Sequence, residues 1–170
     1  YLFFESGTSL LLIDQHAAQE RITYEKLLNQ LESKKIEVQR LLTPLVMRLS
    51  TQEMLAWEEA KGRLEDIGIS TTQWDDESIA IHSHPELITA PEISVRNILV
   101  GEKVSRSDND TLARWACRSS VMAGDEVRQE GALFLRDRLL ECKDPFICPH
   151  GRPTVVEIEE KFLNKQFLRG

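Results

Sequence analysis

Two short stretches of the sequence hold the residues best suited to chemistry. In the first, DQHAAQERITYE at 14–25, an apolar run ends at Asp14, and His16 and Glu20 follow. Because residues i and i+4 share one face of a helix, His16 and Glu20 would present an imidazole and a carboxylate one turn apart. Both groups are common ligands of divalent metal ions, so this stretch could form one side of a metal site.

The second stretch is CPHGRP at 148–153. Side chains two residues apart in an extended segment point to the same side, so Cys148 and His150 would face one way. Another cysteine, Cys117, lies in a predicted helix. These thiols and imidazoles, together with the carboxylates of the first stretch, suit Zn²⁺ or a second metal that shares the oxygen ligands.

A purely structural interpretation of the same residues is open as well. Asp14 could cap the helix that follows it, His16 could be an ordinary surface histidine, and the cysteines could be buried packing groups. Glu20 could pair with Arg21 or Tyr24. Acidic residues often open a helix, so neither spacing is specific for a metal, and spacing alone favours this structural interpretation.

The elements that must position these residues mix strands and helices. Apolar periodicity and turn residues indicate a hairpin near the N-terminus, followed at once by the helix that would carry Glu20. Strands are predicted at 1–4, 9–13, 69–74, 78–82 and 155–158, and helices at 17–31, 52–67, 93–100, 111–122, 126–142 and 159–168. Pro44 is expected to break the apolar segment 38–47, and the polar segment 103–110 is expected to be a loop. The turn of the hairpin is expected at 5–8. Ser50 and Thr51 are candidate caps before the helix 52–67, and Gly68 is well placed to end it.

The fold class expected from this pattern is α+β, or mixed α/β, because the strands and helices do not alternate regularly. The chain has 170 residues, which is enough for one ordinary domain or two small subdomains. The strongest strand runs and most of the candidate ligands lie within the first ~40 and the last ~55 residues. The middle of the chain therefore resembles an insertion.

Composition excludes some classes of function. The formal net charge of −7 argues against strong autonomous binding to DNA, because phosphate contacts need clustered Lys and Arg. Three cysteines, an odd number, indicate a reducing compartment and not a disulfide framework. No run approaches the roughly 20 apolar residues of a membrane span, and no signal peptide is visible. Since the first residue is Tyr1, we expect a piece of a longer protein.

The combination of motifs resembles the C-terminal domain of the MutL family of DNA mismatch repair. The stretch 14–25 matches the family's D-Q-H-A-x2-E-x4-E signature in full. Three further motifs of that family follow in the expected order: ACR at 116–118, CPHGRP at 148–153, and FLR at 167–169, which is similar to the family's F-x-R ending. The resemblance spans essentially the whole chain.

This resemblance implies a metal-dependent endonuclease that nicks one strand of duplex DNA, and it implies a homodimer. The expected organisation is a dimerisation subdomain with the metal site, formed by both chain ends at 1–42 plus 114–170. An external or regulatory subdomain would be inserted at 43–113. Apolar strand faces near 1–4 and 155–158 are the expected dimer interface.

The resemblance also implies the site residues. By motif position, the catalytic residues would be Asp14, His16 and Glu20, and the metal ligands would be His16, Glu20, Cys117, Cys148 and His150. Oxygen and imidazole groups suit a hydrolytic Mn²⁺ or Mg²⁺, and the softer cysteines and His150 suit a structural or regulatory Zn²⁺, with Glu20 as a possible bridge. Phosphate contacts or support of the ligand loops are the roles considered for Arg118, Arg152 and Arg169.

A further motif, QRLLTP at 39–44, matches the Q-x-x-L-x-P pattern by which this family is thought to bind the replication sliding clamp. In an extended peptide, Gln39 would make polar contacts while Leu42 and Pro44 fill an apolar cleft. An ordinary linker is the alternative interpretation of this segment.

The remaining expectations concern partners. The resemblance implies the mismatch-recognition protein MutS, an N-terminal ATPase domain of the same chain, no membrane, and a bacterial cytoplasmic location near the nucleoid. The acidic charge predicts that this fragment alone binds duplex DNA weakly. A non-catalytic dimerisation and clamp-binding module with a structural zinc is the alternative, although a structural zinc would not need Asp14 and Glu20.

Overall fold

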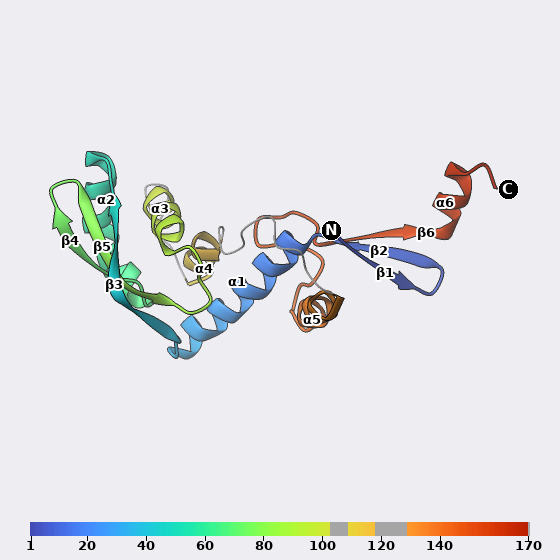
Figure 1. Ribbon diagram of the computed structural model, residues 1–170, viewed down its shortest axis with the longest axis horizontal. Helices are drawn as coiled ribbons and strands as arrows, with labels where there is room; N and C mark the ends of the chain where they lie inside the picture. Colours follow the sequence, from blue (N-terminus) through green and yellow to red (C-terminus); the bar gives the residue numbers. More distant parts are fainter. Residues whose placement is uncertain (103–108, 118–128, 170) are drawn as a thin grey trace. The chain divides into compact units, whose positions relative to one another are not determined.

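The computed structural model describes residues 1–102, 109–117 and 129–169, and the chain divides into two compact units. Unit 1 comprises Tyr1–Ile22 and Met122–Gly170, and unit 2 comprises Thr23–Val121. The described residues form six helices and two three-stranded antiparallel sheets (Figure 1). The predicted α+β fold class is confirmed, and the subdomain bounds inferred from the sequence stay a prediction.

The sheet of unit 1 joins both ends of the chain. Its strand order is β1-β2-β6, and these strands run over Leu2–Ser6, Ser9–Ile13 and Val155–Glu159. Gly7, with φ of 59°, opens the two-residue turn between β1 and β2, because a tight hairpin turn needs a positive φ there. The predicted N-terminal hairpin is therefore present.

One face of this sheet packs on helix α5 (Gln129–Leu140). Leu135 and Leu139 of α5 form a core with Ile13, Ala18 and Ile22, and partly buried residues of the same sheet face complete it. Residues of the opposite face, which we call the outer face, follow from the strand register and the alternation of side chains. The outer face carries the apolar residues Phe3, Leu10, Leu12, Val156 and Ile158, and Glu5 opposite Leu10 on β1.

Unit 2 contains the larger core. Its sheet has the order β3-β5-β4, and these strands run over Val38–Arg48, Ser78–Pro85 and Ser70–Asp75. The same unit contains the helices α2 (Thr51–Asp66), α3 (Pro91–Glu102) and α4 (Asn109–Cys117). Trp57 at its centre is fully buried and donates its indole N–H to Thr71. The ends of α2 lie where the sequence predicts them, with Ser50 as the N-cap and Gly68, at φ of 84°, just beyond the last turn.

Helix α1 (Gln15–Ser33) begins in unit 1 and continues in unit 2, and helix α6 (Glu160–Gln166) follows β6 in unit 1. The expected interruption at Pro44 was wrong, because β3 continues through it. The register of β3 shifts between Arg40 and Leu45, and β3 lies at the edge of its sheet. Edges and bulges tolerate proline, since the missing N–H is not needed for pairing there.

Three sequence predictions extend outside the described residues: the loop expected at 103–110, the part of the helix 111–122 beyond Cys117, and the first three residues of the helix 126–142. Within the described ranges, no helix is both long enough and apolar enough to cross a membrane.

Candidate metal centre

Asp14 starts helix α1. Its Oδ1 accepts hydrogen bonds from the backbone N–H groups of His16 at 2.9 Å and Ala17 at 3.1 Å, as an N-cap does. Its own backbone N–H donates to the carbonyl of Thr154 at 2.9 Å, which ties the helix start to the segment before β6. Asp14 therefore sets the position of the first turn of α1, and with it the position of His16.

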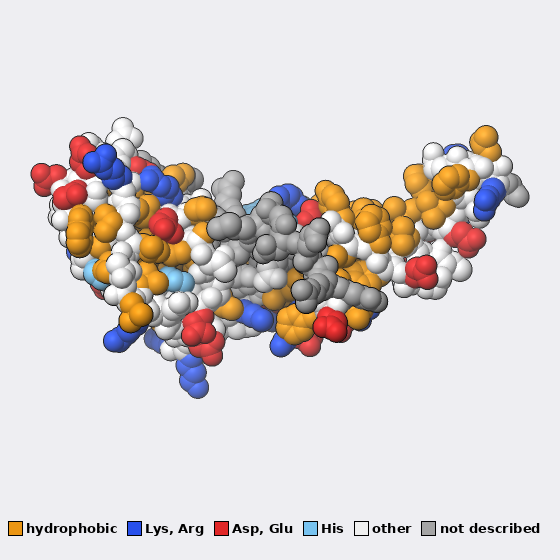
Figure 2. All heavy atoms as spheres, viewed as in Figure 1, with side chains coloured by type: hydrophobic (Ala, Val, Ile, Leu, Met, Phe, Trp, Pro, Cys, Tyr) orange, Lys and Arg blue, Asp and Glu red, His pale blue; other side chains and the backbone are white. Residues whose placement is uncertain are grey.

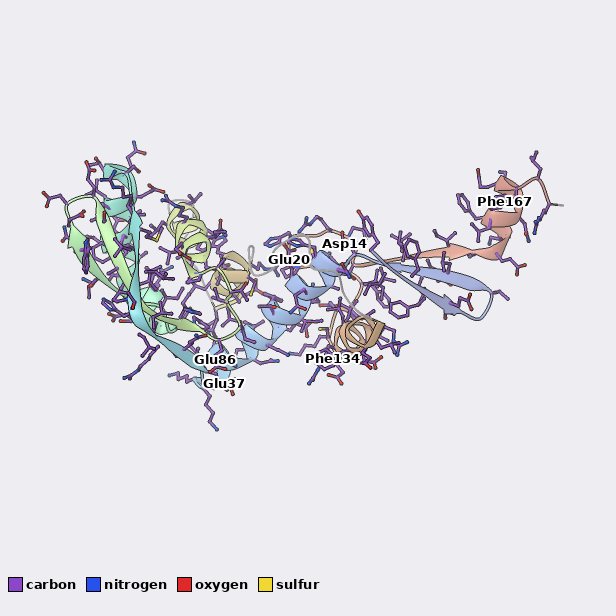
Figure 3. All side chains as sticks on the ribbon, in the orientation of Figure 1. Asp14, Glu20, Glu37, Glu86, Phe134 and Phe167 are labelled. Atoms are coloured by element: carbon purple, nitrogen blue, oxygen red, sulfur yellow. The ribbon has the colours of Figure 1, made fainter. Side chains whose placement is uncertain are left out.

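His16 and Glu20 lie one turn apart on α1, as the i and i+4 spacing predicts, with 3.4 Å between His16 Nε2 and Glu20 Oε1. The Glu20 side chain is only 2% exposed. Figure 3 shows Asp14 at the beginning of α1 and Glu20 farther along it. The other ring nitrogen, His16 Nδ1, is buried and has no hydrogen-bond partner among the residues that the structure describes.

The CPHGR stretch forms a tight hairpin, held by its own backbone. The Cys148 N–H donates to the Arg152 carbonyl at 2.8 Å, and the Gly151 N–H donates to the Cys148 carbonyl at 2.9 Å. Gly151 has φ of 83°, the conformation that closes a three-residue hairpin loop, and Pro149 suits the first position of the turn. The extended conformation expected for this stretch was therefore wrong: Pro149 and Gly151 favour a turn, which leaves Cys148 buried and His150 exposed.

Arg152 joins this hairpin to α1. Its Nη2 lies 2.6 Å from Glu20 Oε2, and its backbone N–H donates to the Sγ of the buried Cys148 at 3.4 Å. Hydrogen bonds with Glu20 and then with Cys148 raise the pKa of Arg152, so the guanidinium stays charged. Four side chains, those of His16, Glu20, Cys148 and Arg152, are thus brought together; we call them the Glu20 cluster.

Arg21 is a supporting residue that sequence reasoning did not identify. It is buried, and its Nε donates to the carbonyl of Ile147 at 2.6 Å, next to Cys148. The Thr154 N–H adds a bond to the Phe146 carbonyl at 3.0 Å. In the sequence, this supporting role could have been indicated only by the position of Arg21 directly after Glu20 in the motif.

The other predicted site residues lie in several places. Cys117 is buried at the end of α4 in unit 2, and its part in a metal site stays a prediction. His150 is exposed at the tip of the hairpin, and Arg169 is exposed beyond α6, where its N–H donates to the Asn164 carbonyl at 2.8 Å. Arg118 lies outside the described residues.

The donors of the Glu20 cluster suit a metal ion in kind. Imidazole, carboxylate and thiol are all zinc ligands, and a buried ring nitrogen without a partner is a group that a bound ion would satisfy. Within 1–102, 109–117 and 129–169, however, no group of three or more His, Cys, Asp or Glu side chains is placed to hold a metal ion. Arg152 supplies the positive charge beside Glu20 instead.

The predicted clamp-binding residues lie on the edge strand β3. Gln39 is exposed and Pro44 is partly buried. Leu42 has a relative exposure of 106%, so its whole side chain projects from the bulged part of the strand. An apolar side chain presented in this way is available to a partner.

Comparison with known proteins identifies the family of this chain. Residues 1–127 match the family described as the MutL C terminal dimerisation domain. The protein named DNA mismatch repair protein MutL from Clostridium perfringens (strain 13 / Type A) is 36% identical over 178 residues, which cover 99% of this chain and 26% of that protein.

Two relatives of the same name come from Listeria. The protein from Listeria welshimeri serovar 6b is 32% identical over 186 residues, covering 99% of this chain and 29% of its own length. That from Listeria monocytogenes serovar 1/2a is also 32% identical, with 99% and 30% covered. The chain thus spans less than a third of these relatives. It belongs to the MutL family of DNA mismatch repair proteins and represents their C-terminal dimerisation domain.

Proposed function

We propose that this domain is a metal-dependent endonuclease that nicks one strand of duplex DNA during mismatch repair. The observation that supports this proposal is the Glu20 cluster. It combines a buried carboxylate from α1, a buried imidazole nitrogen from the same helix that has no hydrogen-bond partner within the described part of the chain, and a buried thiol from the hairpin. All three belong to the motifs that a purely dimerising domain would not require.

The residues of the chain have separate parts in this proposal. His16, Glu20 and Cys148 would bind metal, with Cys117 and His150 as further expected ligands; Zn²⁺ suits the thiols and Mn²⁺ or Mg²⁺ suits the oxygens. A divalent ion bound there would activate water and stabilise charge on the phosphoryl oxygens. Asp14 holds the first turn of α1, so His16 stays beside Glu20. The hairpin excludes solvent from Cys148.

The test is nicking of supercoiled plasmid in Mn²⁺ by the full-length protein that contains this chain. Glu20→Gln and Asp14→Asn should each lower the nicking rate by about ten- to a hundredfold, because substitutions around a metal site typically have effects of this size. Glu32→Gln, an exposed carboxylate on the same helix, is the control and should nick normally. If both site variants cut like the parent, the catalytic assignment fails.

A non-catalytic dimerisation and clamp-binding module with a structural zinc is the second candidate. A specific observation favours it: the Asp14 carboxylate caps helix α1, and the Glu20 carboxylate forms an ion pair with Arg152. Both carboxylates therefore have structural work in this domain. This candidate predicts that an Asp14→Ala variant, which removes the cap, loses stability while parent and variant are equally inactive on plasmid.

Dimerisation is proposed to use the outer face of the unit 1 sheet. Phe3 is 64% exposed and Val156 is 48% exposed, and both lie in one row across the sheet with Leu12. Figure 2 shows hydrophobic side chains gathered over the region of β6 and α6. Since the other face already packs on α5, a second copy covering the outer face would give the sheet two buried faces.

The other partners are proposals from the family resemblance. Gln39, Leu42 and Pro44 would bind the sliding clamp through the exposed edge of β3. We further propose MutS and an N-terminal ATPase domain of the same protein as partners, in the bacterial cytoplasm. A net charge of −7 makes duplex DNA a weak ligand of this fragment unless a partner brings the DNA close.

A further inference from the structure

We propose that Arg152 is a built-in competitor for metal: its guanidinium holds Glu20 in the metal-free protein and must leave before Glu20 and Cys148 can share an ion. This inference rests on the metal site of the proposed function, and it concerns what holds that site when no metal is bound. It predicts weaker, more readily reversed metal binding than the ligands alone would give.

The burial of the two partners supports an exchange of cations. The Glu20 side chain is 2% exposed, whereas the Arg152 side chain is 55% exposed. A buried carboxylate needs a positive partner, because desolvation of an unpaired charge is costly. Because the Arg152 side chain is already more than half exposed, its move into water changes its hydration little. A metal cation can therefore replace the Arg152 guanidinium at Glu20.

The position of Arg152 makes it a competitor. Its guanidinium binds Glu20 Oε2 at 2.6 Å, and its own backbone N–H binds Cys148 Sγ at 3.4 Å. Arg152 therefore connects the two donors that a shared ion would connect. Two cations at the same carboxylate repel each other strongly in a buried site, so an ion bound between Glu20 and Cys148 would displace the guanidinium.

The hairpin does not depend on the Arg152 side chain. The backbone of Arg152 pairs with that of Cys148, and Arg21 holds the Ile147 carbonyl from α1. Thr154 pairs with Phe146 at the base of the same segment. Because these contacts remain when the guanidinium leaves, Cys148 keeps its place beside α1.

The first test measures affinity for Zn²⁺ alone and for Mn²⁺ alone by calorimetric titration of the metal-free 170-residue chain. Arg152→Gln should bind metal about tenfold more tightly than the parent, which corresponds to about 1.4 kcal/mol. Arg152→Lys keeps a competing charge and should bind like the parent. Arg138→Gln, which removes the ion pair between Arg138 on α5 and Glu141 just after this helix, is the matched control from the same unit and should also bind like the parent.

Two further readouts do not depend on affinity. Without metal, Arg152→Gln should unfold at a lower temperature than the parent, and saturating Zn²⁺ should abolish this difference. In the parent, the side-chain ¹⁵N resonances of Arg152 should move to solvent-like values when Zn²⁺ saturates the chain. This NMR measurement needs no variant, so it decides the matter even if Arg152→Gln fails to fold.

Equal or weaker metal binding by Arg152→Gln, or an Arg152 resonance that Zn²⁺ leaves unchanged, would overturn the inference. In that case Arg152 supports the bound site, and the proposed nuclease is still judged by the Asp14 and Glu20 variants in the nicking assay. If neither the parent nor Arg152→Gln bound either ion, the inference would fail together with the metal part of the proposed function.

Discussion

The carboxyl group of Glu20 occupies a position that its own chemistry makes costly, since it is buried. The Arg152 guanidinium, 2.6 Å from Oε2, compensates that cost, and His16 Nε2 lies 3.4 Å from Oε1. Removing either partner of such a pair is more damaging than replacing both, because one charge is then left without compensation. At the scale of single residues, the candidate site is therefore defined by which group neutralises Glu20.

The hairpin that carries Cys148 gives a prediction for Gly151. An alanine Cβ would meet no atom within 4 Å, so the cost of Gly151→Ala comes only from its φ of 83°. We expect the free energy of unfolding to fall by about 1–2 kcal/mol, measured by chemical denaturation.

Gly62 is the matched control for this prediction. It lies within α2, has equally open space for a Cβ, and is not among the residues with positive φ. Gly62→Ala should raise the free energy of unfolding by up to about 1 kcal/mol. Changes of the same sign at both positions would contradict the conformational explanation.

Among the elements, β3 shows how a strand can serve a partner. It lies at a sheet edge, its register shifts around 41–44, and Leu42 projects fully into solvent. The backbone irregularity that Pro44 requires therefore also exposes the motif. A regular central strand would have paired this segment on both sides.

We predict that Leu42→Ala weakens binding of this chain to the sliding clamp by about tenfold or more, because a buried anchor residue typically contributes over 1 kcal/mol. Surface plasmon resonance with immobilised clamp would measure the change. Val46→Ala, on the same strand but outside the motif and 49% exposed, should bind like the parent. Unchanged binding by Leu42→Ala would assign the segment to an ordinary strand.

Helix α2 provides a pH-dependent element. Burial raises the pKa of Glu53, but hydrogen bonds from Ser50 and the contact with Arg96 outweigh it, so the folded-state pKa lies below the ordinary 4.5. A depressed folded-state pKa stabilises the protein above the unfolded-state value, and the contribution is lost as pH falls through the folded-state value.

Accordingly, Glu53→Ala should lower the free energy of unfolding by about 1 kcal/mol at pH 7, the usual effect of losing a capping interaction. The difference from the parent should shrink as pH falls below 4.5. Urea unfolding at several pH values measures it. Glu58→Ala, an exposed site on the same helix, is the control and should leave the free energy of unfolding at pH 7 nearly unchanged.

At the scale of the whole molecule, the chain places a sheet with an apolar outer face in one unit and an exposed edge strand in the other. One surface suits a second copy of the chain and the other suits a different partner. The acidic net charge agrees with a domain that meets DNA only through partners.

We predict that Phe3→Glu raises the dissociation constant of the homodimer by about a hundredfold, because a charge would be buried at the centre of an apolar interface. Sedimentation equilibrium measures this constant. Trp74→Glu is the control: Trp74 is an aromatic residue of unit 2 and is 62% exposed. If both variants associate like the parent, the outer face is not the interface.

Much of the local structure could be predicted from the sequence. Gly7 in the first turn, Asp14 before α1, and Ser50 and Gly68 at the ends of α2 indicated their conformations correctly, whereas the CPHGR stretch, which was expected to be extended, forms a hairpin turn. The i and i+4 spacing also predicted the pairing of His16 with Glu20. These features depend on neighbours a few residues away, where backbone preferences and capping bonds act.

By itself, then, the sequence determined the elements, their ends and the identity of the candidate donors. Only the tertiary structure decided that Arg152 meets Glu20 from 132 positions away, that Arg21 holds Ile147, and that Pro44 lies within an edge strand. The physical reason is range. Turn and cap preferences are local, whereas the partner of a buried charge and the free edge of a sheet depend on how distant segments pack.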